Sequence, residues 1–307
     1  MRKYVIFFIL VCFIVTSCTN KKTKYYIEEA ERSKTVLIEN ERNNLTKEID
    51  KEIAVAVDAN DIKLVEKLCK ANPEIISRSY EGENYYSILH YAVVRGKEKS
   101  VKKLLELGMN PNLLTKDGVS PLIYAINGKY LISCVREDFS PEIINDLINF
   151  EADTNFIFES KSLIMHFIIN WSDEEPNVQT FNLLLKKNNL DINMEDSNSY
   201  TALDHAFGCR KINFIYALFV ENNAKVKAEI NYKCLNDESK IETINPTSVL
   251  RELLFEKDSE KYKTKKKVID KLESYGFDYR NEPVPTWICN LIKIIYKDEA
   301  DFYFDNY

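Results

Sequence analysis

Apolar residues recur along the chain in short groups that have the spacing of an α-helix. Most groups open with Ser or Thr, place an aliphatic residue two positions later, and add two apolar residues three and four positions beyond it. Positions i, i+3 and i+4 share one helix face, and a hydroxyl residue just before the helix can accept from its free N–H groups. A second apolar helical pattern follows each group and leads into a tail containing Asp or Asn. The leading aliphatic residues are Ile53, Leu89, Leu122, Ile164, Leu203, Leu250 and Ile288.

The spacing of these groups indicates a stacked repeat. Consecutive leading residues are 36, 33, 42, 39, 47 and 38 positions apart. Units of this size bury their apolar faces by stacking on one another, and the longer intervals add loop insertions at a small cost in loop-closure entropy. The glycines agree, since Gly96, Gly128 and Gly208 fall at or near the expected turn between paired helices. Gly108 and Gly276 suit a left-handed helix end.

Two segments of the chain resemble ankyrin repeats. Ser87-Ile-Leu-His-Tyr-Ala92 is similar to the Thr-Pro-Leu-His-x-Ala signature of that family, and Asp117-Gly-Val-Ser-Pro-Leu122 is a second match. Weaker matches extend the resemblance over roughly residues 50 to 295. It implies an all-α ankyrin-repeat solenoid of about six to seven degenerate helix-turn-helix repeats with loop insertions. It also implies a structural role for His90, in hydrogen bonding near the hairpin.

The N-terminus carries a second pattern. Arg2 and Lys3 precede an apolar run over residues 4–15, which suits a signal sequence better than a membrane span. The following Val15-Thr-Ser-Cys18 resembles a bacterial lipobox. That resemblance implies cleavage before Cys18, lipid including palmitate on this cysteine, and a place in the cell envelope. By the same resemblance, Thr at position 19 favours attachment to the outer membrane. It does not indicate whether the protein lies on the periplasmic or the outer surface of that membrane. The alternative is an ordinary secretory signal with an incidental cysteine.

These features divide the chain into four expected parts. We expect a signal peptide over 1–17, a polar and partly helical tether over 18–49, the repeat domain over 50–297 and an acidic-aromatic tail over 298–307. Trp287 and an Ile-Ile pair are expected to cover the end of the stack. The tail either folds back as a cap or hangs free, and we favour the cap because terminal repeats must hide their apolar face.

Charge narrows the choice of partners. The formal net charge is −6, which disfavours nucleic acid as a partner. The negative net charge also argues against a membrane contact through a polybasic segment. The lipid on Cys18 is therefore expected to anchor the protein. The one basic cluster, residues 261–267, is interpreted as a solvated charge run in an insertion before the last full outer helix.

The cysteines give no metal or disulfide framework. With Cys12 removed and Cys18 lipidated, the five that remain show no metal-ligand spacing. Cys69 is expected as a buried thiol, and a bridge between Cys134 and Cys209 stays open. The five are Cys69, Cys134, Cys209, Cys234 and Cys289.

Catalytic motifs are not apparent in the sequence. Asp204 and His205 lie near Ser199, but adjacent helix residues point in different directions and no nucleophile elbow accompanies them. We expect no enzyme activity, no cofactor and no metal site.

The candidate site is a file of side chains, one from each inner-helix group. Each side chain lies two residues after the leading aliphatic residue, and we call this place the second free position. Stacking should align these residues along the concave groove that ankyrin repeats use to bind proteins, with aromatic and Arg residues suited to binding hot spots. The alternative is that they shield the edge of the core. The candidates at this position are Tyr91, Tyr124, His166 and His205. Tyr86 and Tyr200, just before the capping Ser87 and Thr201, and Arg95, just before the turn, are expected to extend the same surface.

We therefore expect a lipid-anchored, monomeric protein that binds another protein through its concave face. The alternatives are an immunity protein that neutralises a toxin and, less favoured, a small-molecule receptor or an enzyme.

Overall fold

The computed structural model describes residues 48–77, 87–131, 140–234, 237–297, 300–301 and 303. The signal peptide, Cys18, the tether, Tyr86, Cys134 and most of the tail lie outside these residues. The chain divides into two compact units. Unit 1 comprises residues 1–109, 113–118 and 129–138, and unit 2 comprises residues 110–112, 119–128 and 139–307.

Among its described residues, unit 1 contains two helix-turn-helix pairs and a short additional helix. In each pair an inner helix contacts the outer helix that follows it; inner helix α3 also contacts inner helix α6, and outer helix α4 contacts outer helix α7. This is the stacking that the repeated apolar pattern predicts. The elements are α3 (Glu48–Asp58), α4 (Ile62–Ala71), α5 (Glu74–Ser77), α6 (Ile88–Val94) and α7 (Glu98–Glu106).

The start and end of α6 follow from its sequence. Ser87 Oγ accepts from the backbone N–H of His90 at 3.3 Å, and Nδ1 of His90 accepts from the backbone N–H of Ser87 at 3.2 Å. This reciprocal capping box confirms the structural role predicted for His90. After α6, Gly96 takes a positive φ of 63° and turns the chain toward α7.

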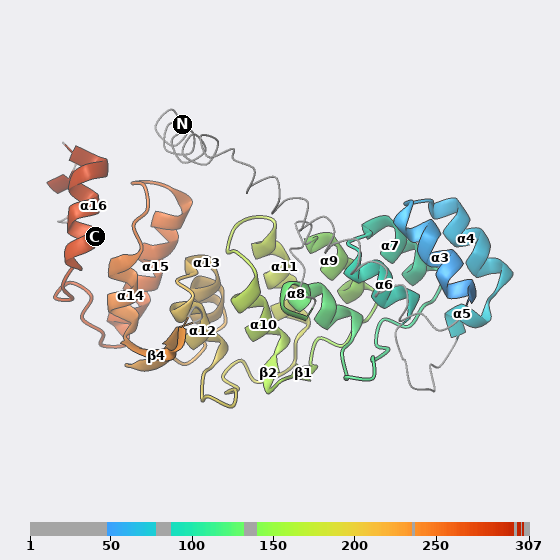
Figure 1. The fold of residues 1–307 in the computed structure, drawn as a ribbon. Coiled ribbons are helices and arrows are strands. Elements are labelled where there is room, and N and C mark those ends of the chain that lie inside the picture. Colours follow the sequence, from blue (N-terminus) through green and yellow to red (C-terminus); the bar gives the residue numbers. More distant parts are fainter. Residues whose placement is uncertain are drawn as a thin grey trace. The chain divides into compact units, whose positions relative to one another are not determined.

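Unit 2 by itself has the same organisation of inner and outer helices, whose labels are shown in Figure 1. Inner helix α12 contacts α10 and α14, while the outer elements contact one another in the order α9, α11, α13 and α15. The elements are α8 (Pro121–Leu131, whose last residues belong to unit 1), α9 (Pro141–Asn149), β1 (Ile157–Phe158), β2 (Lys161–Ser162), α10 (Leu163–Asn170), α11 (Asn177–Lys187), α12 (Ala202–Gly208), α13 (Ile212–Ile215), the π-helix η1 (Tyr216–Glu221), β3 (Ile230–Cys234), β4 (Asp237–Ile244), α14 (Pro246–Glu252), α15 (Glu260–Ser274) and α16 (Thr286–Tyr296).

The predicted all-α class is confirmed. Among the described residues, the strands form two short antiparallel hairpins, β1–β2 and β3–β4. None of the described helices has the length and apolar character needed to span a bilayer.

Two local predictions need correction. Gly128 lies inside α8, which continues to Leu131, and so does not mark a turn between helices. The basic cluster over 261–267 belongs to α15 itself, because this helix has a buried stripe that includes Tyr262 and Val268. The left-handed conformations predicted for Gly108 and Gly276 are confirmed, with φ of 92° and 89°.

Asparagine side chains join successive repeats in unit 2. One arrangement occurs three times: an Asn Oδ1 in the tail of one repeat accepts from a backbone N–H in the tail of the next. The pairs are Asn112 with Asp153 at 2.7 Å, Asn155 with Asn189 at 2.6 Å, and Asn193 with Lys225 at 2.7 Å. The recurring Asp/Asn tails are therefore junctions between repeats.

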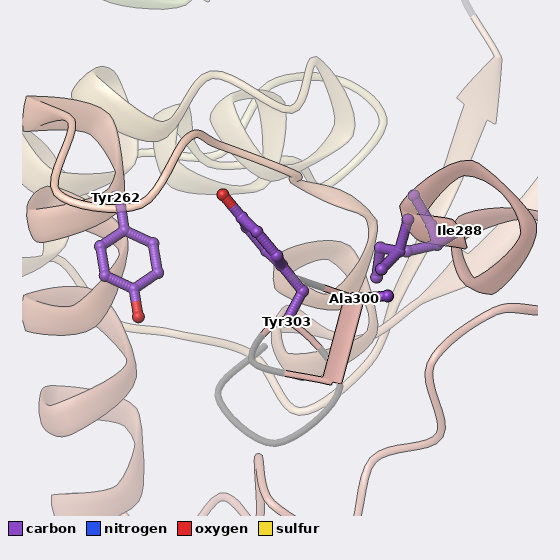
Figure 2. Close-up of a cluster of buried hydrophobic side chains, with 5 residues drawn as sticks. Tyr262, Ile288, Ala300 and Tyr303 are labelled. Atoms are coloured by element: carbon purple, nitrogen blue, oxygen red, sulfur yellow. The ribbon is translucent and has the colours of Figure 1, made fainter. Parts of the chain in front are cut away.

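The described tail residues Ala300 and Tyr303 pack onto the last repeat. Figure 2 shows the ring of Tyr303 between Tyr262 and Ile288, in a buried cluster that also contains Ile292 and Ala300. The hydroxyl oxygen of Tyr303 accepts from the backbone N–H of Lys257 at 3.0 Å. For the described tail residues, the cap interpretation is confirmed.

The residues that make the cap differ from those expected. Ile288 and Ile292, four positions apart, point from α16 into the core. Trp287 is 57% exposed, and Ile294 and Ile295 are also exposed. They lie on other faces of α16, so the tail covers the core in their place.

Candidate functional site

The predicted file of side chains is largely buried. At the second free position of the inner helices, Tyr91, His166 and His205 are buried, whereas Tyr124 is half-buried. Val55 in the first described repeat is 52% exposed. The structure therefore does not bring the named candidates together on one open surface, and each has its own local partners.

Tyr91 and Arg95 both bind Asp58 within unit 1. The Tyr91 hydroxyl donates to Asp58 Oδ2 at 2.6 Å, and Arg95 Nε donates to Oδ1 at 2.9 Å. Lys97 Nζ donates to the Asp58 backbone carbonyl at 3.0 Å. These bonds attach α6 and the turn after it to the C-terminal end of α3, which leaves Arg95 half-buried.

His166 is covered by the β1–β2 hairpin. Its Nε2 lies 2.9 Å from the Phe158 carbonyl oxygen, and its Nδ1 lies 3.0 Å from Nδ2 of Asn127. The carbonyl can only accept, so Nε2 carries the proton and Nδ1 accepts from the amide. Burial lowers the pKa of His166, although the Phe158 carbonyl opposes this shift. The neutral imidazole fastens the hairpin to α10.

His205 is the centre of a second, larger network. His205 Nε2 lies 3.0 Å from Asp196 Oδ2, and His205 Nδ1 lies 3.0 Å from the Tyr232 hydroxyl. The Tyr200 hydroxyl donates to the Asn231 carbonyl oxygen at 2.6 Å. Because Tyr232 and Asn231 belong to β3, these contacts hold the β3–β4 hairpin against α12.

Asp196 is the charged member of this network. Burial alone would raise its pKa, but the hydrogen bond with His205 and the backbone N–H groups of Tyr200 and Asn198 outweigh it and lower the pKa to about 2. The carboxylate therefore stays ionised beside His205 down to low pH.

Gly208 allows the hairpin to approach. A Cβ atom at this position would lie 2.5 Å from the Tyr232 ring, closer than packed carbon atoms can come. Glycine is required here for close contact and not for a left-handed turn. Tyr232 and Asp196 are the site residues that sequence reasoning missed. The signal that could have found Tyr232 is the 47-residue interval between Leu203 and Leu250, which is the longest in the chain.

The residues that superficially resembled a catalytic triad have separate structural partners. Asp204 Oδ2 accepts from the backbone N–H of Thr201 at 2.8 Å and pairs with Lys227 at 2.8 Å. His205 turns instead to Asp196. Within the described part of the chain, no group of three or more His, Cys, Asp and Glu residues could hold a metal ion.

Three cysteines within the described residues are free thiols. They are Cys69, Cys209 and Cys289. Burial raises the pKa of Cys69 to about 11, in agreement with the predicted packed thiol. Because Cys209 is free, the bridge to Cys134 that was left open is not formed here.

The outward faces of the two hairpins remain open to solvent. Ile157 of β1 is 49% exposed and Ile241 of β4 is 60% exposed. On the longer hairpin, residues alternate as in a half-buried sheet, with Tyr232 buried while its neighbour Asn231 and the residue opposite, Thr243, are exposed.

The hairpins are linked through the turn that lies between them in sequence. The backbone N–H of Ser197 donates to Ser160 Oγ at 3.4 Å, and Tyr200 reaches β3 as described. We use the term hairpin row for the described residues of 157–162, 196–200 and 230–244. The hairpin row covers side chains of α10 and α12, so the row itself is the exposed surface over these two helices.

Comparisons with known proteins agree with this architecture. Residues 53–137 match the family model for ankyrin repeats, in three copies. Over 165 residues the chain is 27% identical to the ankyrin repeat protein OPG189 of vaccinia virus (strain Copenhagen), and the match covers 54% of this chain and 26% of the viral protein. The chain thus spans about a quarter of the length of this curated relative. Residues 53–137 therefore carry ankyrin repeats, and the stacked helical pairs within each unit have the all-α fold class of an ankyrin-repeat solenoid.

Proposed function

We propose that this chain is a non-catalytic binding protein whose ankyrin repeats contact another protein on their concave side. Ankyrin repeats are generally protein–protein interaction modules. The assignment of the binding surface rests on the two faces of the hairpins: one face covers the inner helices and the other is open to solvent. The Phe158 ring contacts the His166 ring and the Tyr232 hydroxyl bonds to His205, whereas Ile157 and Ile241 face solvent. A partner would therefore contact the hairpin row, with Tyr124 as the half-buried candidate on an inner helix.

We also propose that the chain is anchored in a cell envelope by lipid on Cys18. The motif Val15-Thr-Ser-Cys18 after a basic and apolar N-terminus supports this assignment. The tether over 18–49 would then connect the lipid to the repeats.

Crosslinking and affinity capture from the native envelope test the binding role. A double variant, Ile157→Glu with Ile241→Glu, changes the hairpin row. The matched control, Leu114→Glu with Ile294→Glu, changes two exposed apolar residues outside it. We expect one stoichiometric partner that the control retains and the double variant loses.

The possible results test the binding surface, the binding role and the lipid anchor separately. Retention of the partner by the double variant would show that the hairpin row is the wrong surface. Recovery of no specific partner by the wild type would count against a dedicated binding role, while recovery of a toxin would favour the immunity alternative. Labelling with radioactive palmitate tests the anchor, because Cys18→Ala should abolish incorporation.

A further inference from the structure

The outer helices of unit 1 carry a concentrated set of lysines. Lys63, Lys67 and Lys70 follow one another at positions i, i+4 and i+7 of α4, so they share one helix face, and all are exposed. On the neighbouring α7, Lys99 and Lys102 are exposed as well. The two helices contact one another, which brings the lysines onto adjoining surfaces.

This face is basic in a chain that is acidic overall. The helices α4 and α7 contain six lysines and three glutamates, against a formal charge of −6 for the whole chain. Glu66 pairs with Lys70 at 2.7 Å, and Glu106 pairs with Lys103 at 2.7 Å. The pKa of Glu66 is lowered by Lys70 first, and also by Lys103 across on α7. The charges of the two helices therefore influence each other.

Four lysines of this face have no anionic partner in the part of the chain that the structure describes. They are Lys63, Lys67, Lys99 and Lys102. Two lysines of α15, Lys261 and Lys271, differ because they bond to other elements of unit 2. Lys271 donates to the Phe219 carbonyl oxygen at 2.6 Å, and Lys261 pairs with Asp173 at 3.1 Å. A high lysine content alone does not make a binding surface, whereas unpaired and exposed ammonium groups can bind anions.

We propose that this basic face of α4 and α7 docks on anionic lipid headgroups. Protein–protein interfaces are depleted in Lys and enriched in Arg, and every cation on these two helices is Lys. Leu64, 38% exposed on α4, adds an apolar side chain suited to the headgroup boundary. The net charge of the chain led us to expect that the lipid on Cys18 alone would attach the protein to the membrane. In this proposal the basic face adds a second contact.

The position of the face in the chain supports a membrane over an acidic protein. The lysines begin at residue 63, shortly after the tether of 18–49. The inference rests in part on the proposed anchor, since the tether would hold α4 and α7 near the bilayer. A lipid anchor together with a basic patch gives firmer membrane binding than either alone.

Vesicle cosedimentation of the full chain tests the proposal. One set of vesicles contains phosphatidylcholine alone, and the other an equimolar mixture with phosphatidylglycerol. The variant carries Lys63→Glu, Lys67→Glu, Lys99→Glu and Lys102→Glu. The control has the same change in charge at four other exposed lysines, Lys116→Glu, Lys186→Glu, Lys187→Glu and Lys225→Glu.

We expect the wild type to prefer the anionic vesicles by about tenfold or more, with the preference weakening in high salt. The control should keep most of this preference, and the variant should lose it. A variant that retains the preference, or a wild type that has none, would overturn the proposal. Thermal unfolding checks the fold of the variant, and replacement of the same lysines by Gln provides a milder version.

Two further measurements distinguish lipid binding by the basic face from anchoring through Cys18 and from binding to an acidic protein. Cys18→Ala should reduce binding to both kinds of vesicle and leave the preference for anionic lipid intact, so the anchor and the basic face can fail independently. Crosslinkers placed at Lys67 and Lys102 should reach lipid in the native envelope. Crosslinking of both to one acidic protein would overturn the membrane assignment.

Discussion

The inner helices α12 and α16 of unit 2 begin with the same sequence pattern and have different surroundings. In α12, every residue from Ala202 to Phe207 is buried. In α16, only Ile288 and Ile292 are buried, and the residues equivalent to Ala202 and His205, which are Trp287 and Asn290, are exposed. The shared apolar stripe forms the core in both helices, so the difference lies on the other faces.

An insertion causes this difference. The β3–β4 hairpin closes over α12 and binds His205, whereas the tail closes the core side of α16 and leaves Trp287 open. A polar residue at the second free position can thus indicate a hairpin of the same chain as readily as a binding partner. The two closures, tail and hairpin, can be broken separately.

The largest effect is expected from breaking the tail closure with Tyr303→Ala. This side chain is 1% exposed, and its removal opens a cavity beside Ile288 and frees the Lys257 backbone N–H. Large aromatic-to-Ala changes in a core cost about 3–5 kcal/mol. Denaturant unfolding of the full chain measures the loss. The control Trp287→Ala on α16 should stay within about 0.5 kcal/mol of wild type, and an equal loss in both variants would contradict the comparison.

The next effect is expected from His205→Ala, which breaks the hairpin closure. The change leaves Asp196 and Tyr232 buried without their shared partner, and each unsatisfied buried group costs about 1–3 kcal/mol. Tyr232→Phe removes one of the two bonds and should cost about 1 kcal/mol. Chemical denaturation gives both values, and hydrogen exchange at β3 should rise in both variants. A hairpin that stays fully protected without His205 would show that another contact holds it.

Gly208→Ala should have a moderate effect. The new methyl group meets the Tyr232 ring and forces the hairpin away from α12, for which overpacking costs of about 1–3 kcal/mol are typical. The gain in helix propensity from Gly to Ala offsets part of this cost. In a double-mutant cycle, Tyr232→Ala should relieve the clash. Strict additivity of the two changes would rule out the close approach as the reason for glycine.

The most gradual effect is expected from pH. The folded-state pKa of Asp196 is about 2, below the value of about 3.9 for an unfolded Asp. A lowered pKa contributes stability that is complete above the unfolded value and is lost as the pH falls toward the folded value. Stability should therefore decline from about pH 5 toward pH 2, and Asp196→Asn should flatten this decline. An unchanged pH profile in the variant would assign the decline to other carboxylates.

Much of the fold could be predicted from the sequence because the inner-helix signals are local. The caps at Ser87 and Thr201 and the turn at Gly96 depend only on neighbouring residues, and all are present. The β3–β4 hairpin could not be predicted in this way. Its stability comes from contacts to residues about 27 or more positions away, such as the bond between His205 and Tyr232.

The candidate site was harder to predict for the same physical reason. The apolar period fixes which helix face Tyr91 or His205 occupies, but not whether another segment covers that face. In α15, Lys265 is buried and donates to the Leu253 carbonyl oxygen at 3.0 Å. A lysine within a buried stripe interrupts the apolar pattern, and the run over 261–267 therefore resembles a solvated segment.

The asparagine junctions between repeats have an evolutionary consequence. In each of these three hydrogen bonds the side chain comes from one repeat, and the neighbour supplies a backbone N–H, from Asp153, Asn189 or Lys225. A hydrogen bond to a backbone N–H does not depend on the side chain of the residue that donates it, so that position tolerates almost any residue except proline. Each repeat can therefore mutate, or gain an insertion such as a hairpin, while its connection to the previous repeat is inherited unchanged.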